Sequence, residues 1–114
     1  MEQVANLNVT NIIVQLAGVI APGWQMAQPF LVTLEQDEDG SYLISDEEFA
    51  VYGDGDTLFE ALQDYIISLI DYYELLAVRA KGDPAAEAQF NHLQTYLQPA
   101  LDSELAHPLT FVFN

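Results

Sequence analysis

The segment from Thr57 to Gly82 constrains the fold more than any other part of the chain. Thr57 and Glu60 have the spacing of a capping box, in which the threonine hydroxyl accepts the amide hydrogen of residue 60 and the glutamate carboxylate returns to the amide of residue 57. Apolar residues then recur at helical spacing, which predicts a helix from Leu58 to about Ala80. Its expected buried stripe consists of Leu58, Leu62, Ile66, Leu69, Tyr73 and Leu76.

Short strands are expected before this helix. The alternation of apolar and polar residues over Pro29–Glu35 predicts one strand, and Ser41–Ser45 predicts a second. Between them, Asp37–Gly40 has the composition of a tight turn, so the two strands should form a hairpin. Val and Ile are abundant over Val9–Ile20, which suggests a further strand.

The residues between the hairpin and the long helix suggest one more strand. Asp46–Glu48 is expected to be a polar loop, and the apolar run Phe49–Tyr52 that follows suggests a short strand. Gly53–Asp56 then has the composition of a turn, with the glycines allowing a tight bend into the capped helix.

A second helix should follow the first. Asp83 has the position of an N-cap and Pro84 that of the first helical residue. Pro99 ends or bends this helix, and Leu109–Phe113 predicts a final strand. The apolar positions of the second helix are Phe90, Leu93, Leu97 and Leu101.

Together these elements predict an α+β fold, with a small antiparallel sheet of three to four strands and two helices packed on one face. The chain has 114 residues and no internal repeat, so we expect a single domain over 1–114. Its hydrophobic content of 51% argues against disorder despite the high charge.

The charge balance narrows the choice of partner. The chain has 18 acidic and 2 basic residues, and a formal net charge of −16. Phosphate backbones are bound by Lys and Arg, so we expect no direct nucleic acid binding. The two bases, Arg79 and Lys81, are explained by the negative end of the long helix. A basic partner is favoured because opposite charge speeds association, although solubility or adaptation to a salty cytoplasm would also explain the charge.

Half of the acidic residues lie between Glu35 and Asp56. We interpret them as a solvated, mutually repelling face that binds a protein. Paired carboxylates also occur in glycoside hydrolases, but a short and strongly acidic chain contains such pairs by chance. The expected partner-binding residues are Asp37, Glu38, Asp39, Asp46, Glu47, Glu48, Asp54 and Asp56.

A calcium loop is the alternative for this region. Glu35, Asp37, Asp39, Gly40 and Asp46 match positions 1, 3, 5, 6 and 12 of an EF-hand loop. However, the first position is Glu rather than Asp and the last is Asp rather than the longer Glu. Strands rather than helices are predicted on both sides, so a loose cation site among these acids is favoured over an EF-hand, and we predict no metal-ligating residue.

The sequence contains no evident catalytic constellation. Cysteine is absent, which excludes disulfides and cysteine catalysis. His92 and His107 have no Ser or Asp at an informative spacing. Gly53–Gly55 lies beside acids and lacks the lysine of a phosphate-binding loop. We therefore expect a protein that is not an enzyme and binds no cofactor.

Nothing in the sequence predicts membrane insertion. The apolar run Ile12–Ala21 has about half the length that a spanning helix needs, and Gln15 interrupts it. The opening residues Met1–Gln3 lack the basic character of a secretory signal. Because cysteine is also absent, we expect a cytoplasmic protein.

The order of these motifs resembles the N-terminal domain of HicB-like antitoxins over about residues 30–76. A strand precedes Asp39-Gly40-Ser41-Tyr42, where the family has a Gly-x-Tyr strand. A second strand and a loop precede Gly55-Asp56-Thr57-Leu58-Phe59-Glu60-Ala61-Leu62, where the family has a Gly-x-Thr-x-x-Glu-Ala helix start. The resemblance implies a small sheet with helices on one side, a small basic ribonuclease toxin as partner, and assembly into dimers or higher oligomers.

These observations favour a non-catalytic protein-binding module, either a HicB-like antitoxin or an orphan relative. Many family members carry a C-terminal DNA-binding part, but no basic residue follows Lys81 in this chain. The alternative is an oligomeric scaffold or assembly protein. It would use the C-terminal strand together with Tyr65 and Tyr72, which we expect on an exposed flank of the long helix.

Overall fold

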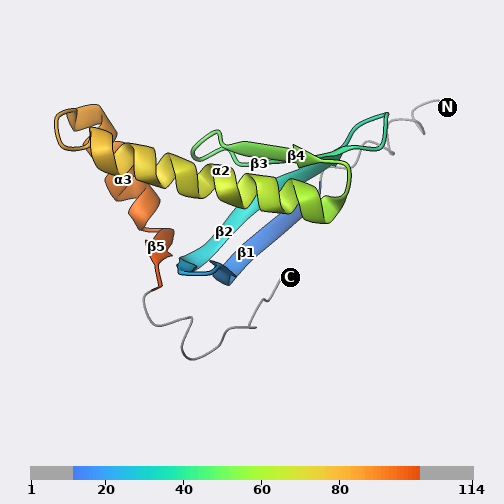
Figure 1. Ribbon diagram of the computed structural model, residues 1–114, viewed down its shortest axis with the longest axis horizontal. Helices are drawn as coiled ribbons and strands as arrows, with labels where there is room; N and C mark the ends of the chain where they lie inside the picture. Colours follow the sequence, from blue (N-terminus) through green and yellow to red (C-terminus); the bar gives the residue numbers. More distant parts are fainter. Residues whose placement is uncertain (1–11, 101–114) are drawn as a thin grey trace. The chain divides into compact units, whose positions relative to one another are not determined.

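The computed structural model describes residues 12–100. Over these residues, strands and helices follow one another as shown in Figure 1. The elements are β1 (Ile12–Ala21), β2 (Trp24–Gln36), β3 (Tyr42–Ser45), β4 (Tyr52–Gly55), α2 (Leu58–Arg79), α3 (Pro84–Gln94) and β5 (Leu97–Pro99). The strand order is β1-β2-β3-β4, with β5 paired to β2. The predicted α+β class is confirmed, and β5 is the addition to the expected sheet.

The described residues form two compact units. The first, called the hairpin unit below, comprises residues 12–14 and 31–68. The second, called the α3 unit, comprises residues 15–30 and 69–100. β1, β2 and α2 each contribute residues to both units. The single domain expected over 1–114 stays a prediction.

The hairpin unit contains the predicted hairpin. β2 and β3 pair antiparallel, with Thr33 opposite Ser45 and Gln36 opposite Tyr42. The turn is closed where the Gly40 amide donates to the Asp37 carbonyl at 2.9 Å. Gly40 has a φ of 93°, a conformation that glycine adopts without steric cost. The turn chemistry of the sequence therefore sets the register of this hairpin.

β4 corrects the predicted positions of the third strand and the following turn. The strand is Tyr52–Gly55 rather than Phe49–Tyr52, so the glycines lie within it. A Cβ on Gly53 would lie against the backbone N and Cα of Tyr65, and one on Gly55 would lie 2.6 Å from the Ala61 nitrogen. The glycines are needed because α2 passes directly over β4, and not because the chain bends there.

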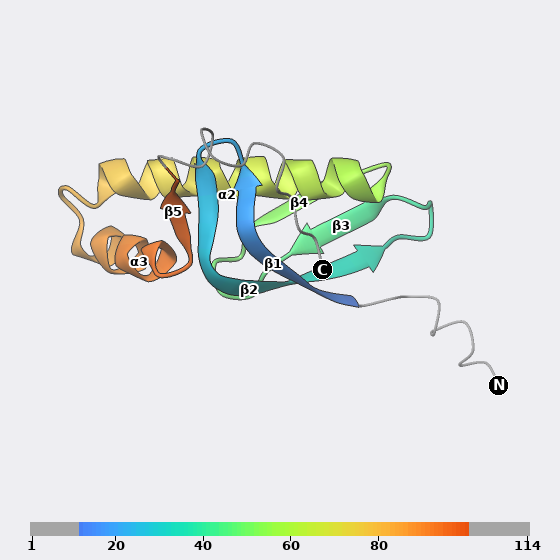
Figure 2. The ribbon, with the colours of Figure 1, turned by 90° about the horizontal axis from the view of Figure 1, so that it is seen from below.

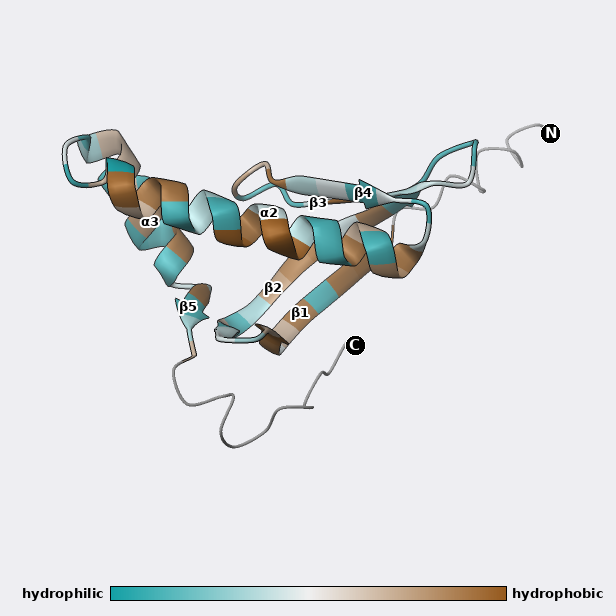
Figure 3. Ribbon diagram, viewed as in Figure 1, coloured by the Kyte–Doolittle hydropathy of each residue, from teal (hydrophilic) through white to brown (hydrophobic). Residues whose placement is uncertain are grey.

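The long helix has the predicted bounds, and Figure 3 shows apolar and polar positions alternating around it. Its predicted stripe is buried from Ile66 onwards, at Ile66, Leu69, Tyr73 and Leu76. At the N-terminal end, however, Ala61 and Tyr65 are fully buried while Leu58 is 46% exposed. The close approach of α2 to the β4 glycines centres the contact on Ala61 and Tyr65, which turns Leu58 towards solvent.

The N-terminus of α2 is capped almost as predicted. The Glu60 amide donates to the Thr57 hydroxyl at 3.1 Å, which confirms the first half of the capping box. The Glu60 carboxylate accepts from the Asp56 amide at 3.1 Å, one residue before the predicted Thr57 amide. Within the described residues, neither helix combines the length and apolar character needed to cross a membrane.

Three aromatic rings pack together in the α3 unit. Tyr73 lies between Trp24 and Phe90, with ring centroids 4.9 Å and 5.0 Å away. Figure 2 shows β5 between α3 and β2, and the register places Trp24 opposite Pro99. This pairing explains why β2 begins at Trp24, five residues before the predicted Pro29.

The second helix begins as predicted and ends earlier. Asp83 is its N-cap and accepts hydrogen bonds from the two amides of residues 85 and 86. The helix ends at Gln94, and Leu97 is a buried residue of β5 rather than a helical one. The Thr95 hydroxyl donates to the His92 carbonyl at 2.7 Å and so completes the last turn. Leu101, His107 and Leu109–Phe113 lie outside the described residues.

Candidate functional site

Most of the predicted partner-binding acids are exposed on the hairpin unit. They lie on the β2–β3 turn, the β3–β4 loop, and β4 with the residue that follows it. The chain has no Lys or Arg before Arg79, so no basic side chain within the described hairpin unit offsets this charge. The exposed predicted acids are Asp37, Glu38, Asp39, Glu47, Glu48, Asp54 and Asp56.

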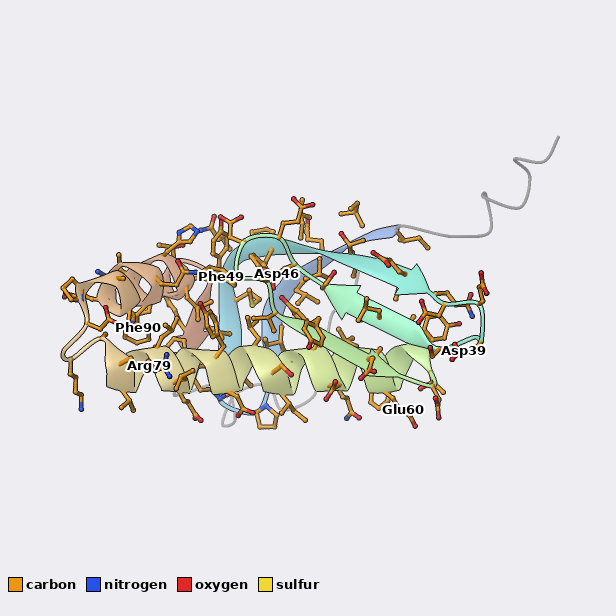
Figure 4. The ribbon with its side chains drawn as sticks, turned by 90° about the horizontal axis from the view of Figure 1, so that it is seen from above. Asp39, Asp46, Phe49, Glu60, Arg79 and Phe90 are labelled. Carbon is orange, nitrogen blue, oxygen red and sulfur yellow. The ribbon has the colours of Figure 1, made fainter. Side chains whose placement is uncertain are left out.

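The β2–β3 turn holds Asp39 in a defined position. Its Oδ1 accepts the Ser41 amide at 2.9 Å and the Ser41 hydroxyl at 2.7 Å. These two hydrogen bonds lower the pKa of Asp39 below its ordinary value. Figure 4 shows Asp39 at the end of the hairpin, where it presents a negative charge at neutral pH.

Asp46 corrects the predicted acidic surface, because it is buried. Its side chain is 6% exposed and accepts hydrogen bonds from the Phe49 amide at 2.5 Å, the Val51 amide at 3.3 Å and the Tyr65 hydroxyl at 2.7 Å. Figure 4 shows Asp46 and Phe49 together in the β3–β4 loop. The carboxylate therefore organises this loop.

The buried Asp46 also argues against the EF-hand alternative. Its oxygens are already used by three donors of the chain, although an EF-hand needs position 12 as its bidentate ligand. The segments on both sides of the turn are β2 and β3, so the helix–loop–helix arrangement is absent. Residues 12–100 contain no group of three or more His, Asp or Glu side chains placed to hold a metal ion.

Tyr65 and Tyr72 do not form the exposed flank that we predicted. Tyr65 is fully buried, and Tyr72 is half-buried with its hydroxyl oxygen 3.3 Å from the Gln89 side-chain nitrogen, which donates to it. Tyr65 therefore contributes nothing to a self-association surface. Its spacing of four residues from both Ala61 and Leu69 is the sequence signal for its burial.

We expect Tyr65 to make the protein less stable at alkaline pH. Burial, then the negative charge of Asp46, then their hydrogen bond raise the pKa of Tyr65 well above its ordinary 10.0. Because the folded pKa lies above the unfolded one, this contribution is complete below pH 10.0 and is lost as the pH rises beyond it. The free energy of unfolding should fall by up to about 1.4 kcal/mol per pH unit from this group alone.

Urea unfolding between about pH 9 and pH 11 would measure this slope in the wild type and in Tyr65→Phe. The other tyrosines remain in both proteins, so the difference isolates Tyr65. The variant should be less stable at neutral pH and should lose stability less steeply above pH 10. Equal slopes would show that Tyr65 ionises in the folded state.

Of the two histidines in the chain, the structure describes His92. His92 is exposed on α3, with its ring edge-on to Tyr96 at a centroid distance of 5.8 Å.

No family model, no curated protein and no solved structure matches this chain. The likeness to HicB-like antitoxins therefore rests on the motifs and on the order of the elements.

Proposed function

We propose that this chain is a non-catalytic protein-binding module that takes a small basic partner on the acidic surface of the hairpin unit. The seven exposed carboxylates on two loops and on the β4 end carry the proposal, since no basic side chain lies among them in the described hairpin unit. A surface of one sign attracts an oppositely charged protein over several ångströms and speeds the encounter.

The specific form of the proposal is a HicB-like antitoxin or an orphan relative that neutralises a small basic ribonuclease toxin in the cytoplasm. The hairpin over β2 and β3 and the capped start of α2 support it, because they follow one another in the order that the resemblance requires. A nucleic acid is the disfavoured partner. Its phosphates would meet the same carboxylates and be repelled.

The test is inhibition of a purified small basic ribonuclease toxin of the kind that HicB-like antitoxins neutralise. We expect RNA cleavage to fall with added protein, and the complex to weaken as salt is raised because salt screens the exposed charges. Undiminished cleavage at a protein concentration in excess of the enzyme would contradict the antitoxin form of the proposal.

A charge-neutralised variant tests which surface is used. The triple variant Asp37→Asn, Glu38→Gln and Asp39→Asn should slow association with the basic ribonuclease about tenfold at low salt. The matched control removes three exposed acids of the α3 unit, as Asp71→Asn, Glu74→Gln and Glu87→Gln. Surface plasmon resonance would give both rates. Equal slowing by the two triples would show that only net charge matters.

A further inference from the structure

β4 is the last strand in the order of the described sheet, so one side of its backbone has no neighbouring strand among residues 12–100. The alternation of the ladder shows which amides point to that side. The Asp46 amide donates to the Val51 carbonyl at 3.1 Å, so residues 46 and 51 form a hydrogen-bonded pair. The pairs Ser45–Tyr52 and Leu43–Asp54 are therefore not hydrogen-bonded to each other, so the amides of Tyr52 and Asp54 point away from β3.

Two outward amides at this end of β4 are already bonded to α2. The Asp54 amide donates to Asp64 Oδ2 at 3.0 Å, and the Asp56 amide donates to Glu60 Oε1 at 3.1 Å. Glu60 and Asp64 are four residues apart on the helix and therefore lie on the same side of it. The distance between residues four apart on a helix is close to the distance between every second amide of an extended chain, so each carboxylate lies opposite one outward amide.

Unpaired amides at a sheet edge are a template for another strand, and natural proteins block such edges. We propose that the Asp64 carboxylate, with Glu60, keeps β4 from pairing with β4 of a second copy of this chain. The two carboxylates occupy the donors that the second strand would need.

β4 of a second copy would present the same alternation of outward amides and carbonyls, which is the pattern that an antiparallel pair of strands needs. In an antiparallel β4–β4 pair, a two-fold axis would relate the two copies. Asp54 of each copy would therefore lie against β4 of the other copy. Such pairing would place Asp54 and Asp56 of both copies close together, and the proposed partner-binding surface would lose these acids. The blocked edge therefore keeps the chain available for its basic partner.

Asp64→Ala tests the proposal by removing the carboxylate while keeping a good helix former at an exposed position. Asp64→Asn is the matched control, because it removes the same charge and retains an acceptor oxygen for the Asp54 amide. Sedimentation velocity over a range of concentrations should show self-association of the alanine variant at least tenfold tighter than that of the wild type and of Asp64→Asn.

The variant Asp54→Pro tests whether the self-association uses the edge of β4. Asp54→Pro removes the outward amide without removing a bond to β3, so it is compatible with an edge strand. Placed in the Asp64→Ala background, it should restore the wild-type sedimentation, with circular dichroism confirming the fold. The proposal is overturned if Asp64→Ala sediments like Asp64→Asn, or if its self-association persists with proline at position 54.

Discussion

Gly53→Ala should strongly destabilise the fold of the hairpin unit. The new methyl group would lie against the backbone N and Cα of Tyr65, and backbone atoms cannot move aside by changing a rotamer. We expect a loss of more than about 3 kcal/mol, at the upper end of what overpacking costs. Small domains are stable by only about 5–15 kcal/mol, so the variant should lose a large share of its stability and unfold at a clearly lower temperature.

Gly82→Ala is the control for this substitution. Gly82 has nothing within 4 Å of an added Cβ and no positive φ, so the same change should leave stability unchanged or raise it by about 0.4–1 kcal/mol. Thermal unfolding followed by circular dichroism would compare the two variants. A Gly53→Ala protein as stable as Gly82→Ala would show that α2 does not rest on β4.

Asp46→Ala is the second substitution with a large expected effect. It leaves three buried donors without an acceptor, namely the amides of Phe49 and Val51 and the hydroxyl of Tyr65. Each buried unsatisfied group costs about 1–3 kcal/mol, so we expect a total loss of about 3 kcal/mol or more. Chemical denaturation of the variant and the wild type would measure it.

The neighbouring exposed acid provides the comparison for Asp46. Glu47→Ala removes the same charge from the same loop and should change stability by less than about 0.5 kcal/mol. In a Tyr65→Phe background, Asp46→Ala should cost about 1 kcal/mol less, because one donor is already gone. Equal costs for Asp46→Ala in both backgrounds would show that the Tyr65 bond contributes nothing to stability.

The sequence predicts those parts of the fold that depend on local chemistry. The hairpin follows from the turn at Asp37–Gly40, and the bounds of α2 follow from the Thr57 cap and the apolar period. The start of α3 follows from Asp83 and Pro84. Each of these signals acts between residues a few positions apart, so it can be read without knowing what packs against the segment.

Several of the errors concern contacts between distant segments. Gly53 and Gly55 have turn composition, yet they lie in a strand because a helix crosses it. Asp46 looks like one more loop acid but is buried, and one of its three donors is the hydroxyl of Tyr65, which lies 19 residues further along. Leu97 fits a helical period but pairs in β5 with the first residues of β2. Periodicity contains no information about such partners.

For the candidate surface, the sequence correctly places seven exposed acids on the hairpin unit and misplaces one. Exposure of charged side chains is the default outcome of their hydration, so composition predicts it well. The exception at Asp46 has three donors, of which the Tyr65 hydroxyl comes from a distant segment that composition does not reveal.

The short connection between β4 and α2 sets the rotational phase of the helix. Only Asp56 and Thr57 lie between the end of the strand at Gly55 and the first helical residue at Leu58. Each helical residue advances the rotation by about 100°, so one inserted or deleted residue would swing the Tyr65 hydroxyl away from Asp46. The length of this connection, rather than any side chain in it, thus determines which tyrosine hydroxyl reaches the Asp46 carboxylate.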